Sequence, residues 1–219
     1  TKSYASGDKD YMISLIFRTS RFSFYLLLVL SLPILFNTEF ILTVWLKTVP
    51  EHTVNFVRLV LLLSFCEALS HPLITALSAT GRIRNYQLIV GGLLMMNLPL
   101  AYVSLCFGAP AESVFVIAIS LSVCCLMARL VMSRRMIGLS VRHFVSSVIL
   151  PVLSVSVAAT ILPVFFGAFS RLSGWMDFVA SALLCVTSAS LMVYFIGCTN
   201  SEKRFIREKA HAMRHKLCW

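Results

Sequence analysis

Long apolar runs without charge constrain the fold of this chain more than any other feature. Residues 86–111 and 144–170 contain no Asp, Glu, Lys or Arg, and each run is longer than the roughly 20 residues that a helix needs to span a bilayer. Of the 219 residues, 58% are hydrophobic and 13% are charged, against roughly 25% charged in soluble domains. The sequence therefore predicts an all-α, polytopic transmembrane helical bundle.

Turn signals divide the chain into about six membrane spans. Gly81 is a plausible helix terminator within the basic turn GRIRN, and the Gly-Ala-Pro sequence at 108–110 ends another apolar run. Between the first two spans, residues 37–50 should form a loop with a short apolar piece, FILTVWL. The spans are expected at about residues 10–36, 52–80, 85–107, 113–132, 144–166 and 175–198.

The distribution of basic residues predicts how the chain is oriented. With six spans both termini lie on one side, and 16 of the 19 Lys and Arg fall on that side, leaving only Lys47, Arg58 and Arg171 elsewhere. Because cytoplasmic loops are enriched in Lys and Arg, both termini are predicted to be cytoplasmic. The net charge of +10 is therefore attributed to cytoplasmic loops beside the lipid bilayer, and no nucleic acid partner is expected.

A carboxylate near the middle of the second span is the first candidate site residue. An ionised side chain at the centre of a membrane helix costs roughly 2.5–3.5 kcal/mol. At about 100° per residue, Glu67 shares one face with Ser64, His71, Thr75 and Ser78. This polar stripe is interpreted as the lining of a water-filled path or substrate cavity. The alternative is that it hydrogen-bonds neighbouring helices, with the carboxyl protonated.

Four further polar residues complete the set of path candidates. Asn97 lies two residues before Pro99, whose ring removes a helix hydrogen bond and favours a kink. Arg18 and Arg21 are one turn apart, so they either offer cations to an anionic substrate at the cytoplasmic mouth or anchor the helix at lipid headgroups. Arg58 falls on the face of the second span opposite to the polar stripe.

The sequence contains no motif that predicts an enzyme. It has no nucleophile elbow, phosphate-binding glycine loop or HExxH motif, and its five His residues are scattered. Neither a metal site nor a cofactor is expected. The seven Cys form no CxxC pair and are interpreted as small reduced hydrophobic residues. The last three spans are expected to be scaffold, and Arg129 is counted with the cytoplasmic cations.

Two long segments resemble a known family of membrane transporters. Residues 74–105, ITALSATGRIRNYQLIVGGLLMMNLPLAYVSL, and residues 33–62, PILFNTEFILTVWLKTVPEHTVNFVRLVLL, resemble bacterial polysaccharide-export flippases of the O-antigen type. These flippases belong to the MATE-like multidrug/oligosaccharidyl-lipid/polysaccharide superfamily. Residues 2–10 resemble the loop after the second helix of a family repeat, and residues 194–209 resemble the usual end of the family.

The resemblance implies an inner-membrane protein of bacteria with about 12–14 helices in two lobes, which moves lipid-linked oligosaccharide by alternating access. Residues 1–135 would then form four spans of the second lobe, residues 136–200 two additional C-terminal spans, and residues 201–219 a basic cytoplasmic tail. The N-terminal lobe of the same protein becomes an expected partner.

The resemblance also implies roles for the candidate residues. Arg18, Arg21 and Arg58 are the cations that would neutralise the pyrophosphate of the substrate, and Glu67 with His71 would couple H⁺ or Na⁺. Two alternatives remain open, namely a MATE-type drug/cation antiporter and a non-transporting membrane assembly subunit. A membrane polymerase or ligase is disfavoured, because the longest outer loop, residues 37–51, is too short for a catalytic domain.

Overall fold

The computed structural model describes residues 9–81, 83–169, 174–199 and 202–204. All regular structure in these ranges is helical. The described part contains six helical segments that are long and apolar enough to cross a membrane: Asp10–Phe36, Thr53–Ala79, Arg84–Cys106, Ser113–Ile137, Val141–Phe165 and Trp175–Gly197. The predicted all-α, multi-pass membrane bundle is therefore confirmed.

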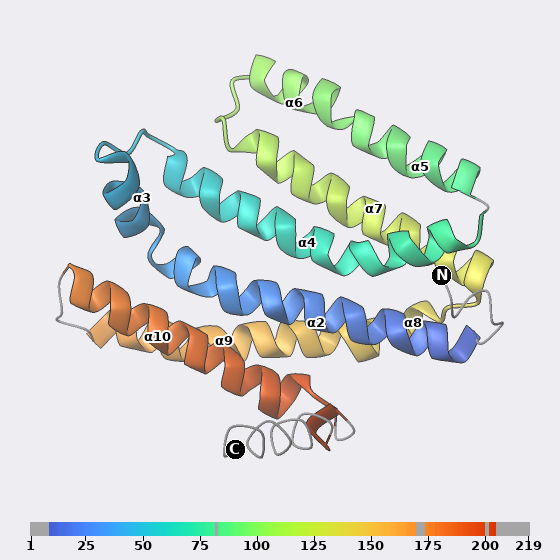
Figure 1. The fold of residues 1–219 in the computed structure, drawn as a ribbon. Coiled ribbons are helices and arrows are strands. Elements are labelled where there is room, and N and C mark those ends of the chain that lie inside the picture. Colours follow the sequence, from blue (N-terminus) through green and yellow to red (C-terminus); the bar gives the residue numbers. More distant parts are fainter. Residues whose placement is uncertain (1–8, 82, 170–173, 200–201, 205–219) are drawn as a thin grey trace, which may run out of the picture.

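Three long helices form the centre of the molecule (Figure 1). Helix α4 (Thr53–Ala79) packs between α2 (Lys9–Phe36) and α7 (Ser113–Ile137). The third span consists of two pieces, α5 (Ile83–Met95) and α6 (Asn97–Cys106), and both pack against α7. The order α2, α4, α7, α5–α6 therefore forms an open row of helices in which α4 is covered on two sides.

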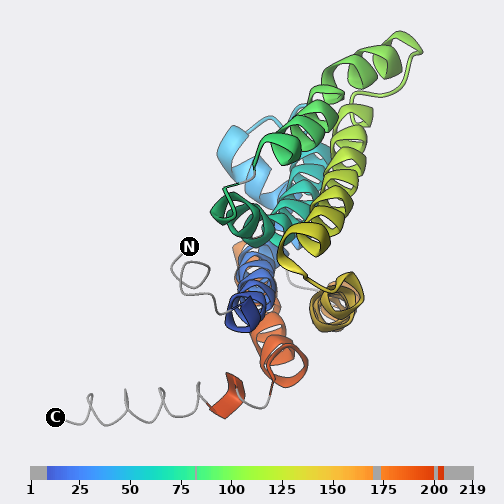
Figure 2. The same cartoon turned by 90° about the vertical axis from the view of Figure 1, so that its right-hand side faces the viewer.

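The C-terminal helices extend this row beyond α2. Helix α8 (Val141–Phe144), the π-helical segment η1 (Val145–Ile149) and α9 (Leu150–Phe169) form the fifth span, while α10 (Trp175–Met192) and the π-helical segment η2 (Val193–Gly197) form the sixth. Helix α10 packs against both α9 and α2. Figure 2 shows α5–α6 and α10 at opposite ends of the assembly.

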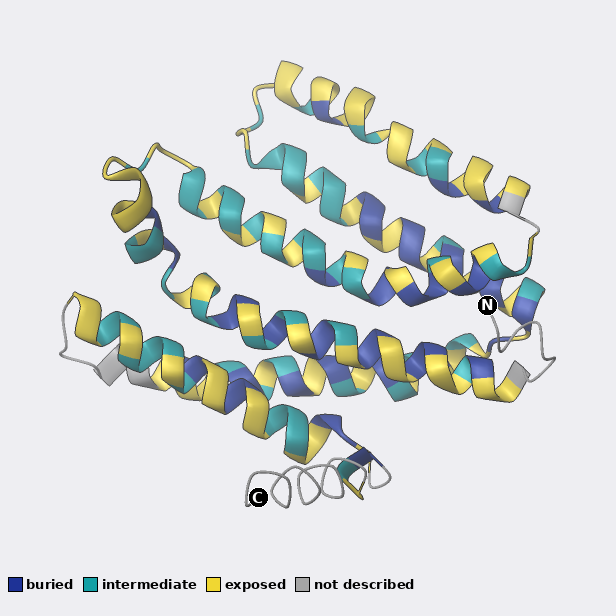
Figure 3. Ribbon diagram, in the orientation of Figure 1, coloured by how far each residue is buried: buried dark blue, intermediate teal, exposed yellow. Residues whose placement is uncertain are grey.

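Apolar side chains fill the interior of the row and also cover much of its outside. Leu32, Leu73, Leu77, Leu130 and Val148 are fully buried where neighbouring helices meet. By contrast, most residues of α5 and α6 are exposed (Figure 3), and most of these exposed residues are apolar. A monomeric soluble protein rarely exposes an apolar patch of this extent, whereas lipid chains would cover it in a bilayer.

The structure corrects the predicted loop between the first two spans. Residues Thr38–Leu46 form a helix, α3, where the sequence predicted a loop. Asn37 connects this helix to α2, because its backbone N–H and its side-chain amide both donate to the carbonyl of Pro33, at 3.1 and 2.9 Å. The chain thus turns out of α2 without leaving the polar groups of Asn37 unpaired.

Two other boundaries differ from the prediction for identifiable reasons. The fourth span was expected to end at residue 132, but α7 continues to Ile137 and stops at Gly138, whose φ of 80° suits glycine. The third span is broken at Met96. Pro99 has no N–H to donate to the carbonyl of Met95, so one helical hydrogen bond is missing next to this break.

A close contact between Gly197 and Tyr25 predicts a sharp sensitivity to one added methyl group. A Cβ built at Gly197 would lie 2.8 Å from the ring carbons Cε2 and Cζ of Tyr25. Gly197→Ala should therefore lower the free energy of unfolding by about 1–3 kcal/mol, as overpacking typically does. The measurement is thermal unfolding of the purified protein in detergent.

Gly91→Ala is the matched control for this substitution. A Cβ at Gly91 meets nothing within 4 Å, and alanine is favoured over glycine within a helix by about 0.5–1 kcal/mol. Equal unfolding temperatures for the two variants would show that the Gly197–Tyr25 contact has no part in holding η2 against α2.

Candidate functional site

A cavity of about 290 Å³ lies between α4, α5–α6 and α7. It brings together three of the predicted path residues, Glu67 and His71 from α4 and Asn97 from α6. The other residues that line it are Leu63, Ser70, Ile74, Leu94, Ala118, Leu121, Ser122, Cys125 and Arg129. The polar stripe of the second span therefore faces a hollow between helices along part of its length.

Arg129 of α7 is the cation of this cavity. The residue is buried, with 8% of its surface exposed, and its Nε donates a hydrogen bond to the hydroxyl of Tyr86 at 3.3 Å. Within the described residues, its Nη atoms have no hydrogen-bond partner and no carboxylate lies within 4 Å of them. A buried cation without a counter-charge is costly, so this arrangement favours a role in binding.

Arg129 and His71 lie at similar depths on neighbouring helices. Each is eight residues from the end of its helix, at Ile137 of α7 and Ala79 of α4, which places both about 12 Å inside that end. Glu67 is one further turn toward the membrane centre. The cavity is therefore lined by the guanidinium of Arg129 from α7 and by the imidazole of His71 and the carboxyl group of Glu67 from α4.

The charged groups of the cavity do not neutralise one another in this structure. Glu67 and Arg129 form no ion pair within 4 Å, and no hydrogen bond joins Glu67 to His71. The carbonyl oxygen Oδ1 of Asn97 is buried and has no partner within the described part of the chain. Groups of both signs are consequently available to a ligand or to an ion that enters the cavity.

The remaining members of the polar stripe do not line the cavity. Ser64 donates to the carbonyl of Val60 at 2.9 Å, and Thr75 donates to the carbonyl of His71 at 3.2 Å, so both hydroxyls are satisfied within α4. Ser78 is exposed. The structure thus divides the predicted five-residue stripe into two cavity residues and three that lie outside it.

Arg18 and Arg21 do not line the cavity and pair with a carboxylate instead. Arg21 Nη2 and Arg18 Nε donate to Oε1 of Glu202, at 2.8 and 3.2 Å. The Glu202 side chain is 3% exposed, that of Arg21 is 10% exposed and that of Arg18 is 49% exposed. This ion-pair cluster attaches residues 202–204 to α2, an arrangement that the sequence did not predict.

The environment of Glu202 favours its ionised form. Burial on its own would raise the pKa of Glu202, but hydrogen bonds from Thr199 and the charge of Arg21 outweigh burial and lower the pKa below its ordinary value. Its Oε2 accepts from the backbone N–H of Thr199 at 2.8 Å. The carboxylate is therefore a fixed counter-charge for the two arginines.

At the opposite ends of α4 and α7, a second polar cluster joins the two helices. His52 Nδ1 lies 2.6 Å from Glu112 Oε1, and Asn55 donates to the same oxygen at 3.2 Å. A backbone hydrogen bond together with those from Asn55 and His52 lowers the pKa of Glu112. Arg58 is nearby in sequence but exposed, and it does not line the cavity between α4, α5–α6 and α7.

Sequence reasoning missed the contribution of the fourth span. Arg129, Ser122 and Cys125 of α7 line the cavity, although this span was expected to be scaffold. The sequence held one signal for Arg129, because it is a cation inside an apolar run. Its position near the end of the predicted span led us to assign it to the cytoplasmic residues instead. Apart from residues 202–204, the predicted basic tail lies outside the described residues.

Comparison with family models, with curated proteins and with solved structures found no match to this chain. The fold and the cavity therefore define its class by themselves. The chain is a multi-pass helical membrane protein with a polar cavity between its spans.

The ion-pair cluster of Glu202 predicts a pH-dependent attachment of the segment that follows η2. The folded pKa of this carboxyl is lowered, so its stabilising effect is present above the ordinary value of 4.5 and is lost as pH falls through the folded pKa. Hydrogen exchange at the Thr199 amide, corrected for intrinsic rates, should become faster between about pH 5 and 3.

Glu202→Gln supplies the control for this titration. The variant should show fast exchange at the Thr199 amide at neutral pH already, with no further change in protection on acidification. Acid-dependent exchange that persists unchanged in this variant would assign the titration to another group.

Proposed function

We propose that this chain is part of a bacterial inner-membrane flippase that moves lipid-linked oligosaccharide for surface polysaccharide synthesis. The single observation that carries the proposal is the buried Arg129, which lines a cavity inside a membrane bundle and has no carboxylate partner among the described residues. A substrate with a pyrophosphate group would supply the missing negative charge. The resemblance of residues 33–62 and 74–105 to polysaccharide-export flippases supports the same class.

The proposed role of Arg129 replaces the one first expected for Arg18 and Arg21. Since both of those arginines pair with Glu202 and neither lines the cavity, they are poor candidates for the central substrate site. Arg129 would donate two charge-assisted hydrogen bonds to phosphate oxygens, while Tyr86 holds its Nε in place. Asn97 and Ser122 would donate and accept hydrogen bonds with sugar hydroxyls.

Transport would require a second lobe across the cavity. Alternating access in transporters of this kind arises when one bundle rocks against another around a site near the membrane midplane. We infer that the partner lobe belongs to the same protein. The exposed side of α4, which carries Thr75 and Ser78, is the surface of this chain that such a lobe would cover.

Glu67 and His71 would couple transport to H⁺ or Na⁺. A carboxylate at mid-membrane that lacks a fixed counter-ion can bind a proton or a metal cation in one conformation and release it in the other. The same residue also favours one alternative, a MATE-type drug/cation antiporter, because an acidic cavity binds cationic drugs. The two functions differ in which cavity charge holds the transported molecule.

Substitution of Arg129 tests the proposed function. In cells that rely on the complete protein for surface polysaccharide, Arg129→Gln should reduce polysaccharide export at least tenfold, because two charge-assisted hydrogen bonds contribute about 1.5–3 kcal/mol each. Arg129→Lys should retain part of the export, since it keeps the charge but loses the paired geometry. The measurement is the amount of polysaccharide on the cell surface at equal protein levels.

Arg134→Gln is the matched control, because Arg134 lies on the same helix and is exposed. It should leave export unchanged. Normal surface polysaccharide in Arg129→Gln cells, accompanied by increased sensitivity to cationic drugs, would overturn the flippase assignment in favour of the drug antiporter.

Substitution of Glu67 separates ion coupling from substrate binding. Glu67→Gln removes the charge and leaves the volume unchanged, so it should abolish the dependence of transport on the H⁺ or Na⁺ gradient while substrate binding persists. Transport in vesicles should be measured with and without each imposed gradient. Gradient dependence equal to that of the unmodified protein would exclude this carboxylate as the coupling site.

A further inference from the structure

A second hollow lies on the outer surface of the bundle, between α2 and the end of the sixth span. It has a volume of about 480 Å³ and its lining is mainly apolar. Phe22, Leu26 and Val29 of α2 form one wall, and Val193 and Tyr194 of η2 form the other. Because both walls belong to membrane-spanning segments, lipid chains surround this groove in a bilayer.

The apolar wall of α2 leads directly to a cation. Phe22, Leu26 and Val29 are spaced at i, i+4 and i+7 and share one helix face, and Arg18 continues this face one turn before Phe22. From Arg18 to Phe36 the helix rises about 27 Å, close to the roughly 30 Å thickness of the hydrocarbon core. The guanidinium of Arg18 therefore lies at the depth of the lipid headgroups.

The opposite wall ends at a second cation. The ammonium of Lys203 donates to the carbonyl of Phe195 at 2.8 Å and lies 5.8 Å from the ring centroid of Tyr194, which lines the groove. Three cations therefore lie at this rim, of which Arg18 and Arg21 pair with the Glu202 carboxylate, while Lys203 contacts the Phe195 carbonyl instead. The rim keeps a positive charge, and the Arg18 side chain is 49% exposed despite its ion pair.

We propose that this groove binds an anionic phospholipid, with one acyl chain between α2 and η2 and the phosphate group between Arg18 and Lys203. The apolar walls match an acyl chain, and the charged rim matches an anionic headgroup at the level where a phospholipid carries it. A zwitterionic phospholipid has the same chains without the net negative charge. The groove should therefore select by headgroup.

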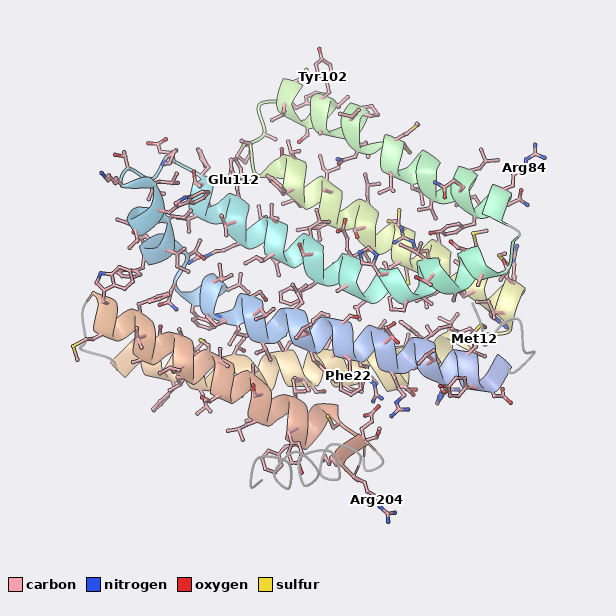
Figure 4. The ribbon with its side chains drawn as sticks, viewed as in Figure 1. Met12, Phe22, Arg84, Tyr102, Glu112 and Arg204 are labelled. Atoms are coloured by element: carbon pink, nitrogen blue, oxygen red, sulfur yellow. The ribbon has the colours of Figure 1, made fainter. Side chains whose placement is uncertain are left out.

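This inference is independent of the transported substrate. The groove is separated from the Arg129 cavity by α2 and α4, and none of its lining residues lines that cavity. Figure 4 shows Phe22 on α2, Arg204 at the lower end of the molecule and Arg84 at the upper right, on α5. Basic residues on the same predicted side of the membrane but remote from the groove are thus available as controls.

The test is the retention of lipid by the purified, full-length chain, measured by native mass spectrometry. Phosphatidylglycerol and phosphatidylcholine with identical acyl chains are titrated separately in detergent. We expect tighter binding of phosphatidylglycerol, and a loss of about fivefold in its affinity for each cation removed in Arg18→Gln and Lys203→Gln. Phosphatidylcholine binding should remain the same in these variants.

The matched control is the double variant Arg84→Gln/Arg134→Gln, which removes two exposed cations from α5 and α7, helices that do not line the groove. It should keep the preference for phosphatidylglycerol. An equal loss in this control, or equal binding of both lipids to the unmodified chain, would show only a general attraction to basic residues and would overturn the site.

A steric variant tests the groove without changing its charge. Ser190 lines the groove, so Ser190→Trp should fill it and reduce binding of both lipids. Thr187→Trp, one turn earlier on α10 and outside the groove, should not. Stronger retention of a polyprenyl phosphate than of phosphatidylglycerol, lost in Ser190→Trp, would instead assign the groove to a lipid carrier and overturn the phospholipid as occupant.

Discussion

The packing of α4 between α2 and α7 is the constraint on which the rest of the structure depends. Leu69, Leu73 and Leu77 are spaced four residues apart and are buried along one side of α4. Since a helix has 3.6 residues per turn, burying this stripe turns Glu67 and His71 to the other side, toward the cavity. An apolar stripe thus fixes where polar side chains can gather within the membrane.

Two buried arginines in this chain show opposite solutions to the cost of burial. Arg21 and Arg129 each expose 8% of their surface, yet Arg21 is paired with the Glu202 carboxylate at 2.8 Å, whereas the hydroxyl of Tyr86 is the partner of Arg129. Removing a cation from water without a counter-charge costs several kcal/mol. The Arg21–Glu202 pair is explained as a structural attachment. The environment of Arg129 is explained if an anion from outside this segment binds to it.

The number and positions of the spans could be predicted because hydropathy is a local property of the sequence. Asn97 and the Glu67–His71 pair could also be proposed, since polar groups within apolar runs stand out. The pairing of Arg21 with Glu202 could not, because it joins residues separated by 181 positions. The burial of Arg129 depends on α4, α5 and α7 packing together, and the positive-inside pattern favoured the opposite environment for it.

The helix that covers the cavity is also the most weakly attached of the spans. Only 6% of the apolar window of α5–α6 is buried among the described residues, compared with 33% for α4, and the span is interrupted at Met96. A displacement of α5–α6 would change access to Arg129 and Asn97 without disturbing the Leu69–Leu73–Leu77 packing of α4. The α2–α4–α7 centre carries the large buried side chains and α5–α6 carries few of them, so the cavity lies at the boundary between a well-buried centre and a sparsely buried cover.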